Sequence, residues 1–374
     1  MEEAESLQGK IVRVLFLIPH PREGASSRYR VWQYLPYLEA RGIHCTVSSF
    51  LSPRFYRIAY QRGHWRTKIG CFLASSLRRL WDLVRSHWYD LVFIHLEAFP
   101  IGPPYLEWMM KASGIPLVFD LDDAIFLPRS SVANPLVGWL RRPEKTASIL
   151  RWSRSVITCN DYLRQYAEQF NPRVHVIPTC VDVSQFSVKP NGSPRSRPLI
   201  GWIGSHSTAP YLDLLRPVLG SLKKRHDFAF KIVGSLSPFR VDGVEVIQEP
   251  WTLDKDVSYF QELDIGVYPL PEEPWVLGKT GFKTVQYMAV GVPCVVSDIG
   301  RNREIIRDGI NGFLAKSEDE WVEKLGQLIS DPCLRMRLGQ SGRVTVEENY
   351  SVSVYVDRLV SVLREAADSS EDKV

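Results

Sequence analysis

In residues 278–296, GKTGFKTVQYMAVGVPCVV, two lysines and two glycines lie within the first six positions and can together bind an anion. The stretch has the pattern of a loop followed by an amphipathic helix and a buried strand. Amides at the start of a helix attract negative charge, and the ammonium groups of Lys279 and Lys283 can converge on the same point. A phosphate-bearing ligand is one interpretation. The other is a solvated turn whose glycines permit positive φ and whose lysines face water.

Residues 204–211, GSHSTAPY, offer a second place for a phosphate. Gly204 ends an apolar run, Ser207 or Thr208 can cap a helix, and Pro210 suits the first turn of that helix. The amides of this helix start can bind a phosphate. An ordinary cap without a ligand is the open alternative.

Residues 22–30, REGASSRYR, follow the first apolar run of the chain. Gly24 leaves room for a ligand, and Ser26 and Ser27 can donate hydrogen bonds to it. Arg28 can clamp an anion through two parallel hydrogen bonds. The alternative is a turn in which Ser27 caps a helix and Arg28 faces solvent.

Acidic and imidazole side chains follow two further runs. In residues 120–123, DLDD, Asp122 can orient or deprotonate a hydroxyl group. An Asp-x-Asp metal site is a rival interpretation, and a third treats Asp120 and Asp123 as structural residues that pair with arginines. His95 can line the same site or be hydrogen-bonded to the backbone.

Short apolar runs must position these groups, and they alternate with amphipathic stretches. In the first half we expect strands at residues 11–19, 45–50, 90–96, 116–121, 155–160 and 174–178, and a helix at 28–42. In the second half we expect strands at residues 199–204, 228–234, 244–248, 263–270 and 292–298. The runs are apolar on both faces, as in parallel sheets covered by helices. The pattern predicts two doubly wound α/β domains.

The domain limits follow from composition. Residues 187–198, SVKPNGSPRSRP, have the composition of a linker. We predict an N-terminal domain at 10–188, a linker at 189–198, a C-terminal domain at 199–350 and a C-terminal helix at 351–368. In such folds ligands bind beyond the carboxyl ends of the strands.

The overall composition is that of a folded chain with two domains. Its 374 residues are 45% hydrophobic and 24% charged, and a net charge of +4 does not indicate nucleic-acid binding. The six cysteines are scattered, without the spacing of zinc or redox motifs. No apolar run approaches the roughly 20 residues of a membrane span, and the N-terminus lacks an apolar leader. We predict a cytoplasmic protein.

Residues 54–85 carry eight Lys or Arg and one acid, Asp82, with aromatic residues between them. An apolar stripe at helical spacing is expected to face the core; it consists of Ile69, Phe72, Leu73, Leu77, Leu80, Trp81 and Val84. The basic and aromatic remainder suits an anionic membrane surface, which suggests a lipid-linked acceptor and a peripheral place at the inner membrane face. A solvated basic face is the alternative, and no nucleic-acid motif accompanies the charge.

Several motifs in order resemble those of a known family. IGWIGS and the segment DIGVYPLPEEPWVLGKTGFKTVQYMAVGVPCVVSDIGRNREIIRDGINGFLA resemble the nucleotide-sugar domain of group 1 retaining glycosyltransferases of the GT-B fold. SSRYRVWQYLPYLEARG and VHVIPTCVDVSQF extend the resemblance over nearly the whole chain. The resemblance implies two Rossmann-like domains that face each other across a cleft, with the C-terminal helix packed back on the N-terminal domain.

The resemblance also implies roles for individual residues. The donor would be bound by Gly204, Ser205, His206, Ser207, Lys279, Thr280, Gly281, Phe282, Gln286 and Glu304. The acceptor would be bound by Gly24, Ser26, Ser27, His95 and Asp123. The catalytic residues would be Asp122, Lys283 and Arg28, without a metal.

The sequence departs from the family at the donor loop. The family's two glutamates, eight positions apart, are here Gly278 and Gln286. The usual arginine and lysine after the first strand of the C-terminal domain are replaced by SHST, where His206 can replace them only when protonated. We hypothesise that the cationic clamp has moved to Lys279 and Lys283.

The resemblance implies a retaining, metal-independent glycosyltransferase with a nucleoside-diphosphate sugar as donor and no other cofactor. The acceptor would be a hydroxyl group of a glycan or a lipid-linked glycan, in cell-surface polysaccharide or glycoconjugate synthesis. Because the two glutamates are absent, a catalytically inactive protein that binds a nucleotide or glycan is the alternative. A GT-B sugar epimerase is a further one.

Overall fold

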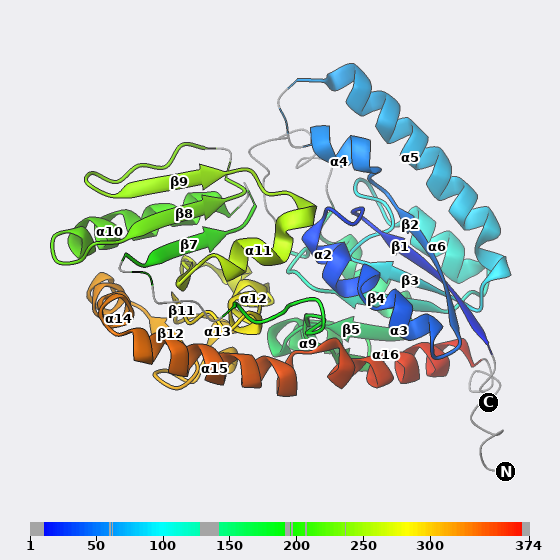
Figure 1. The fold of residues 1–374 in the computed structure, drawn as a ribbon. Helices are drawn as coiled ribbons and strands as arrows, with labels where there is room; N and C mark the ends of the chain where they lie inside the picture. Colours follow the sequence, from blue (N-terminus) through cyan, green and yellow to red (C-terminus); the bar gives the residue numbers. More distant parts are fainter. Residues whose placement is uncertain are drawn as a thin grey trace, which may run out of the picture. The chain divides into compact units, whose positions relative to one another are not determined.

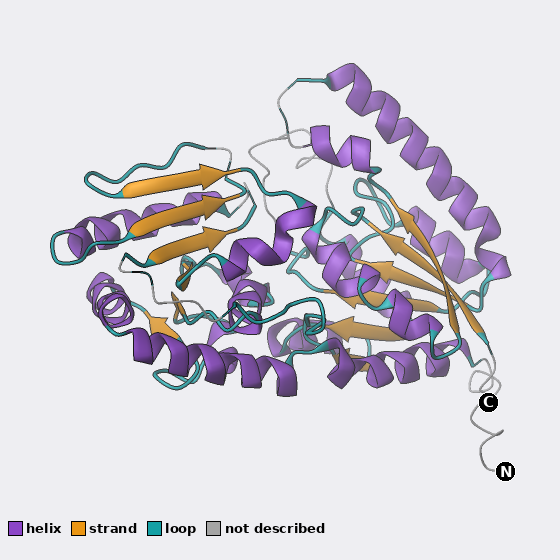
Figure 2. Cartoon of the chain, viewed as in Figure 1, coloured by secondary structure: helices purple, strands orange, loops and turns teal. Residues whose placement is uncertain are grey.

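The computed structural model shows two compact units of α/β architecture. It describes residues 11–59, 61, 63–127, 142–190, 195, 197–205, 208–235 and 237–368. The first unit consists of Met1–Thr179 and Tyr355–Val374, and the second of Cys180–Val354. The elements are labelled in Figure 1, and the strands of each unit are the orange arrows of Figure 2.

The first unit is built on a six-stranded sheet in the order β2-β1-β3-β4-β5-β6, with all neighbours parallel. The strands are β1 (Val12–Ile18), β2 (Ile43–Ser49), β3 (Leu91–His95), β4 (Leu117–Leu121), β5 (Ser155–Thr158) and β6 (Val174–Val176). Every residue of β3, β4 and β5 is buried. Helices on both faces explain why these strands have no polar face.

Helices connect the strands of this unit. They are α2 (Ala25–Ser27), the π-helix η1 (Arg28–Trp32), α3 (Leu35–Glu39), α4 (Pro53–Ala59), α5 (Trp65–Arg85), the 3₁₀ turn η2 (Ser86–Trp88), α6 (Tyr105–Ala112), α8 (Lys145–Trp152) and α9 (Asp161–Glu168). The helix expected at residues 28–42 is therefore divided between η1 and α3. Pro36 lacks an N–H group and lies at the start of α3, where a new helical segment can begin.

The second unit repeats this plan. Its sheet has the order β12-β11-β10-β7-β8-β9, again parallel throughout. The strands are β7 (Leu199–Ile203), β8 (Ala229–Val233), β9 (Glu245–Glu249), β10 (Ile265–Tyr268), β11 (Cys294–Ser297) and β12 (Phe313–Ala315). All are near predicted runs except β12, a three-residue strand that the sequence analysis missed.

The helices of the second unit cover this sheet and its core. They are η3 (Ala209–Leu215), α10 (Arg216–Lys223), η4 (Leu253–Lys255), α11 (Asp256–Gln261), η5 (Pro274–Gly278), α12 (Phe282–Ala289), α13 (Asn302–Ile305), α14 (Glu318–Ser330) and α15 (Pro332–Asn349). A cluster of buried aliphatic and aromatic side chains, which includes Trp202 and Phe230, lies between the sheet and helices α10 and α14.

The last helix, α16 (Val352–Ala367), belongs to the first unit from Tyr355 onward. Arg41 pairs with Asp357, and Arg364 donates a hydrogen bond to the carbonyl oxygen of Arg41. The packing of the C-terminal helix on the N-terminal domain is thus confirmed. The first unit ends at Thr179, before the limit predicted from composition, and the described residues of the predicted linker at 189–198 belong to the second unit.

A glycine in β10 allows helix α12 to pack closely against the sheet of the second unit. A Cβ atom at Gly266 would lie 2.5 Å from ring atoms of Tyr287. Tyr287 cannot retreat, because it is fully buried and its hydroxyl group lies 3.2 Å from the carbonyl oxygens of Gly201 and Val267. The strand and helix α12 can pack at this distance only with glycine at this position.

We therefore expect Gly266→Ala to lower the free energy of unfolding by about 1–3 kcal/mol, as overpacked cores do. Gly220→Ala in α10 is the matched control, since the nearest atom to its added Cβ is 4.0 Å away. Alanine should stabilise that helix by up to about 1 kcal/mol. Urea titrations of both variants measure the difference, and equal midpoints would contradict the packing argument.

Candidate functional site

The first unit gathers polar side chains at the carboxyl ends of three neighbouring strands. Ser26 lies in α2, directly after β1, and His95 is the last residue of β3. Asp120 lies in β4, and Asp122 follows that strand. The parallel register of β3 and β4 places His95 opposite Asp120. This is the edge at which sheets of this kind bind ligands.

These side chains form one continuous hydrogen-bonded chain. Nδ1 of His95 lies 2.7 Å from Oδ2 of Asp120, and Nε2 of His95 lies 2.7 Å from Oγ of Ser26. The hydroxyl group of Ser26 donates to Oδ2 of Asp122 at 2.8 Å. His95 and Asp120 are fully buried and Asp122 is 6% exposed, whereas Ser26 is partly exposed, so the chain reaches solvent at Ser26.

The hydrogen bonds restrict where protons can be. If Ser26 donates its only hydrogen to Asp122, Nε2 of His95 must donate to Ser26. His95 then carries two protons, because Nδ1 faces the carboxylate of Asp120. If instead Asp122 carries the extra proton and donates to Ser26, Ser26 donates to a neutral His95. The two states differ by one proton moved between Asp122 and His95 through Ser26.

The two carboxyl groups have opposite pKa shifts. Burial alone would raise the pKa of Asp120, but the positive charge of Arg30 and hydrogen bonds from His95 and Arg30 lower it to about 2. Burial raises the pKa of Asp122, and Asp120 adds to this effect while His95 opposes it. Oδ1 of Asp122 is buried and accepts no hydrogen bond within the described part of the chain. A carboxyl group with a raised pKa and an unoccupied oxygen suits proton transfer.

Arg30 is a residue of this site that the sequence analysis missed. Its guanidinium group forms a two-point ion pair with the carboxylate of Asp120, and one of its nitrogens donates to the carbonyl oxygen of Ile177 at 2.7 Å. The side chain of Arg30 is almost fully buried. An aspartate inside the apolar run VFDL indicates that a buried cation must pair with it. The sequence contains many arginines, so it does not show which one is the partner. The interpretation of Asp120 as a structural residue that pairs with an arginine is correct.

The backbone at the end of β3 is strained. Leu96, directly after His95, has φ 62°, which branched side chains rarely adopt. Its N–H group donates to the carbonyl oxygen of Asp120 at 2.9 Å, and this bond keeps the turn in place. Strain of this kind costs on the order of 1–3 kcal/mol and occurs mainly at functional sites.

The remaining predicted residues of the first unit lie around this chain. Ser27 is fully buried, and its Oγ accepts a hydrogen bond from the N–H group of His20. It does not cap a helix, because α2 begins after Gly24. Arg28 donates to the carbonyl oxygens of Arg22 and Glu23 and so supports its own loop.

Gly24 and Asp123, both predicted in the acceptor site, make contacts within their own loops. A Cβ atom at Gly24 would lie 2.3 Å from Cβ of His20, so this glycine permits close packing within the loop. Asp123 accepts a hydrogen bond from the N–H group of Ala124. A role of either residue in acceptor binding stays a prediction.

The second unit has its own candidate site at the start of α12. Gly281 is the N-cap residue with φ 66°, and a Cβ atom there would lie 2.6 Å from Ile305. The loop can therefore turn into the helix only with glycine. The hydroxyl group of Thr280 accepts a hydrogen bond from the N–H group of Phe282, which shapes the loop before the first turn.

Lys283 lies in an aromatic environment. Its Nζ is 4.9 Å from the ring centroid of Tyr268 and 5.7 Å from that of Trp202, at the ends of β10 and β7. Lys283 forms no hydrogen bond or ion pair with any described residue. Burial lowers the pKa of Lys283 to about 7, and the positive charge of Lys279 adds to the shift. Because the site supplies no anion of its own, an anionic ligand would stabilise the charged form.

Glycines bring the backbone close to this lysine. A Cβ atom at Gly204 would lie 2.3 Å from the ring of Trp202 and 2.9 Å from Cε of Lys283. A Cβ atom at Gly234 would lie 2.0 Å from the carbonyl oxygen of Gly204. Nearby, Nζ of Lys279 lies 3.7 Å from the ring centroid of Trp275. The structure therefore brings together Gly204 and Lys283, as predicted, and adds three aromatic rings that were not predicted.

The helix start expected after Gly204 is not an α-helix. The segment Ala209–Leu215 is a 3₁₀ helix, and α10 begins only at Arg216. Thr208 is its N-cap residue but donates its hydroxyl hydrogen back to the carbonyl oxygen of Ser205. The predicted side-chain cap is therefore wrong at Thr208. His206 and Ser207 lie outside the described residues.

Two donor-site residues differ in burial. Gln286 is buried in α12, whereas Glu304 is exposed and pairs with Arg301. Gly278 ends the turn η5 and is buried. Among the described residues there is no group of three or more His, Cys, Asp or Glu that could hold a metal ion.

Comparison with known proteins identifies both halves of the chain. A family model described as Glycosyltransferase Family 4 matches residues 28–185, and one described as Glycosyl transferases group 1 matches residues 197–331. The chain carries the two domains of a group 1 glycosyltransferase. The two parallel six-stranded sheets are the two Rossmann-like domains of the GT-B fold.

This group 1 glycosyltransferase has distant curated relatives. It is 23% identical to alpha-D-kanosaminyltransferase of Streptomyces kanamyceticus over 289 residues, which are 70% of this chain and 73% of that protein. It is 25% identical to the capsular polysaccharide biosynthesis glycosyltransferase CapM of Staphylococcus aureus over 119 residues, which are 31% of this chain. That match spans only 30% of CapM.

A solved structure supports the same fold. The structure of Alr3699/HepE of Anabaena in complex with UDP and glucose has a TM-score of 0.64 and 15% sequence identity. The match covers 95% of this group 1 glycosyltransferase and all of that chain. At this identity the likeness establishes the fold.

The ion pair of Asp120 can be tested by stability. We expect Asp120→Asn to lower the free energy of unfolding at pH 7 by about 3–5 kcal/mol, because Arg30 is left buried without a partner. The folded-state pKa of Asp120 lies below its unfolded value of about 3.9, so its contribution is present above that pH and is lost toward pH 2. The difference between the variant and the wild type should shrink over that window.

Asp357→Asn is the matched control. Asp357 also pairs with an arginine, Arg41, but its side chain is 77% exposed. Such pairs contribute about 0–1 kcal/mol. Urea titrations between pH 7 and pH 2.5 provide the measurement. Equal losses of unfolding free energy in the two variants at pH 7 would mean that the buried ion pair stabilises the fold no more than the exposed one.

Proposed function

We propose that the protein transfers a sugar from a nucleoside-diphosphate sugar to a hydroxyl group of a glycan or lipid-linked acceptor, with retention of the anomeric configuration and without a metal ion. The donor is assigned to the second unit and the acceptor to the first. A role in cell-surface polysaccharide synthesis fits the similarity to CapM, whose description names capsular polysaccharide biosynthesis.

Lys283 is the observation that carries the donor assignment. It is a lysine at the carboxyl edge of a parallel sheet, with aromatic neighbours and no anionic partner among the described residues. A diphosphate that leaves an anomeric carbon develops negative charge, and a pre-positioned ammonium group stabilises that charge. The similar HepE structure, whose description names UDP and glucose, supports the same class of donor.

The chain of Ser26, His95 and Asp122 is assigned to the acceptor. The bond from the anomeric carbon to the diphosphate breaks and its electron pair leaves with the diphosphate. The acceptor oxygen forms the new bond to that carbon, and its proton moves to the carboxylate of Asp122. Asp122 is a carboxylate before this step, which corresponds to the state in which Ser26 donates to Asp122 and His95 is doubly protonated.

An inactive binding protein is the competing function. It is favoured by Gly278 and Gln286, which stand where the family has glutamates. Binding alone, however, gives no reason for a carboxyl group of raised pKa with an unoccupied oxygen next to a proton-carrying histidine. Asp122 therefore favours the enzyme.

Nucleotide binding is the first test. We expect one of UDP, GDP, dTDP and CDP to raise the melting temperature, since a ligand at a hundred times its dissociation constant adds about 2.7 kcal/mol of stability. EDTA should leave the shift unchanged. A shift that EDTA removes would contradict metal independence, and no shift with any nucleotide would favour the competing function in its glycan-binding form.

The assignment of Lys283 can be tested with the same nucleotide. We expect Lys283→Met, which keeps most of the apolar stem, to weaken binding by about 1.5–3 kcal/mol, the usual contribution of a charged hydrogen bond. Lys316→Ala, at an exposed lysine of the same unit, is the control and should bind like the wild type. Calorimetric titration gives both constants. Unchanged affinity in Lys283→Met would refute the cationic clamp.

The role of Asp122 separates catalysis from binding. We expect Asp122→Asn to lower kcat by about 10²–10⁴-fold, the usual contribution of a positioned base, with unchanged nucleotide affinity. In the wild type, kcat should fall as the pH drops through the raised pKa of Asp122, above the range of an ordinary aspartate. Release of nucleoside diphosphate from the activated sugar is the readout. A variant with wild-type turnover would exclude Asp122 as the base.

A further inference from the structure

Helix α5 has its apolar side in solvent and its polar side against the protein. Its buried residues are Ser75, Arg79 and Asp82. Seven large apolar side chains at helical spacing are each more than half exposed, and we call them the α5 apolar stripe: Trp65, Ile69, Leu73, Leu77, Leu80, Trp81 and Val84. The expectation that the stripe faces the core is therefore wrong at six of these positions, and Trp65 was not part of that expectation. Only Phe72 packs inward, against Phe50 and Phe99.

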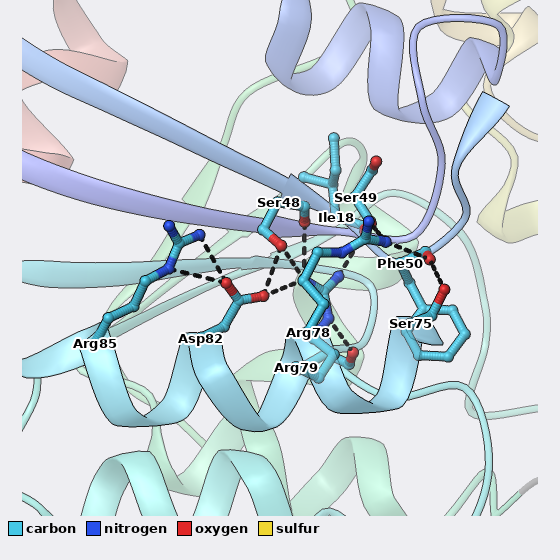
Figure 3. A network of polar contacts seen from close by, with 10 residues as sticks. Ile18, Ser48, Ser49, Phe50, Ser75, Arg78, Arg79, Asp82 and Arg85 are labelled. Atoms are coloured by element: carbon cyan, nitrogen blue, oxygen red, sulfur yellow. Dashed lines mark hydrogen bonds and ion pairs between the residues drawn. The ribbon is translucent and has the colours of Figure 1, made fainter. Parts of the chain in front are cut away.

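A network of polar contacts holds α5 in this orientation, and Figure 3 shows its side chains pointing from α5 toward the ends of β1 and β2. Arg79 donates to the carbonyl oxygens of Ile18 and Ser48 at 2.8 and 2.9 Å. Asp82 accepts a hydrogen bond from the hydroxyl group of Ser48 at 2.6 Å and pairs with Arg79 and Arg85.

The network explains why the stripe cannot turn inward. Arg79 and Asp82 are both fully buried, and rotation of the helix would separate them from their partners in β1 and β2. Loss of one member of a buried ion pair costs about 3–5 kcal/mol. Some of the basic residues that were expected at the surface therefore point into the protein. Arg78 is another of them, since it donates hydrogen bonds to the carbonyl oxygens of Ser49 and Phe50.

The size of the stripe distinguishes it from ordinary surface. Single exposed apolar side chains are normal, but a continuous patch usually marks an interaction site. The 21 residues of α5 extend about 30 Å at 1.5 Å per residue. Helix α6, which packs beside α5 (Figure 1), also exposes Tyr105, Trp108 and Met109.

The charge around the stripe indicates the partner. Between Pro53 and Trp88 the only acidic residue is Asp82, which is buried, so no carboxylate of this segment faces solvent. Arg54, Arg57 and Arg66 are exposed. Cations beside an apolar helix face complement anionic lipid headgroups, and tryptophan favours the boundary between headgroups and acyl chains. None of the described helices is long and apolar enough to span a membrane.

We propose that α5 lies in the surface of an anionic lipid bilayer, with its apolar stripe at the acyl-chain boundary and its exposed arginines among the phosphates. A second copy of the chain is the other occupant to consider. A symmetric dimer through this face would bring two cationic surfaces without carboxylates together, which disfavours it. Lipid binding does not depend on sugar transfer, although it would suit a lipid-linked acceptor.

Flotation with vesicles tests the proposal. We expect the full-length protein to float with vesicles of equal parts phosphatidylglycerol and phosphatidylcholine, and to float much less with phosphatidylcholine alone. Leu73→Glu/Leu77→Glu should lower the partition coefficient on anionic vesicles by about tenfold or more, because two leucines that would enter the acyl-chain boundary are lost. Tryptophan fluorescence of the wild type should shift to shorter wavelength on the anionic vesicles.

Met336→Glu/Val344→Glu is the charge-matched control, since both residues are exposed apolar positions on α15. It should bind vesicles like the wild type, apart from the small effect of two added negative charges. Circular dichroism verifies that each variant is folded.

Three results would overturn the proposal. The wild type could fail to float and show no fluorescence shift, or the α5 variant could bind as well as the control. The wild type could also form a dimer that the α5 variant dissociates, without binding vesicles, and the face would then be an interface between two copies. All three results are measured without nucleotide or acceptor, so they can be distinguished from a failure of the proposed sugar-transfer activity.

Discussion

The ion pair between Arg30 and Asp120 holds the candidate acceptor site together. It links the helical segment after β1 to the end of β4, and both side chains are buried. The positive charge of Arg30 keeps Asp120 ionised where burial would otherwise raise its pKa. An ionised Asp120 fixes His95, which contacts Ser26, and Ser26 donates to Asp122. The position and protonation of Asp122 thus depend on an arginine that need not touch substrate.

The same requirement, that a buried charge be neutralised, separates structural from functional charges elsewhere. In α5, Arg79 and Asp82 neutralise each other, and the helix is fixed with its apolar side outward. In the second unit, burial and the positive charge of Lys279 lower the pKa of Lys283 to about 7, and no described anion opposes the shift. We interpret the paired charges as supports for the fold and the unpaired lysine as the place where a ligand supplies the missing charge.

Much of the fold could be predicted from the sequence because strands buried on both faces form uninterrupted apolar runs. Eleven of the twelve strands in the described residues were expected near their observed positions, and β12 was missed because three residues carry too weak a pattern. The α5 stripe shows the limit of periodicity. Helical spacing reveals two faces of different polarity, but it does not reveal which face is buried.

The candidate site could be predicted only in part, for a related reason. His95, Asp122 and Ser26 lie just after apolar runs, so topology alone brings them to one edge of the sheet. Arg30 could not be found, because the choice among many arginines depends on the helix phase after β1, and the π-helix at Arg28–Trp32 shifts that phase. Thr208 is an N-cap residue as predicted, but its side chain makes no capping hydrogen bond because its hydroxyl group bonds backward to Ser205, a local choice that composition does not determine.

The central claim, that Lys283 binds the diphosphate of a sugar donor, is tested most directly by counting protons taken up on binding. At pH 8, Lys283 is mostly neutral with a pKa of about 7, and a bound diphosphate should raise that pKa so that the lysine gains a proton. Titration calorimetry of the nucleoside diphosphate in buffers of different ionisation enthalpy measures this uptake. We expect an uptake approaching one proton per nucleotide in the wild type and none in Lys283→Met. Binding without proton uptake, or equal uptake in both proteins, would contradict the claim.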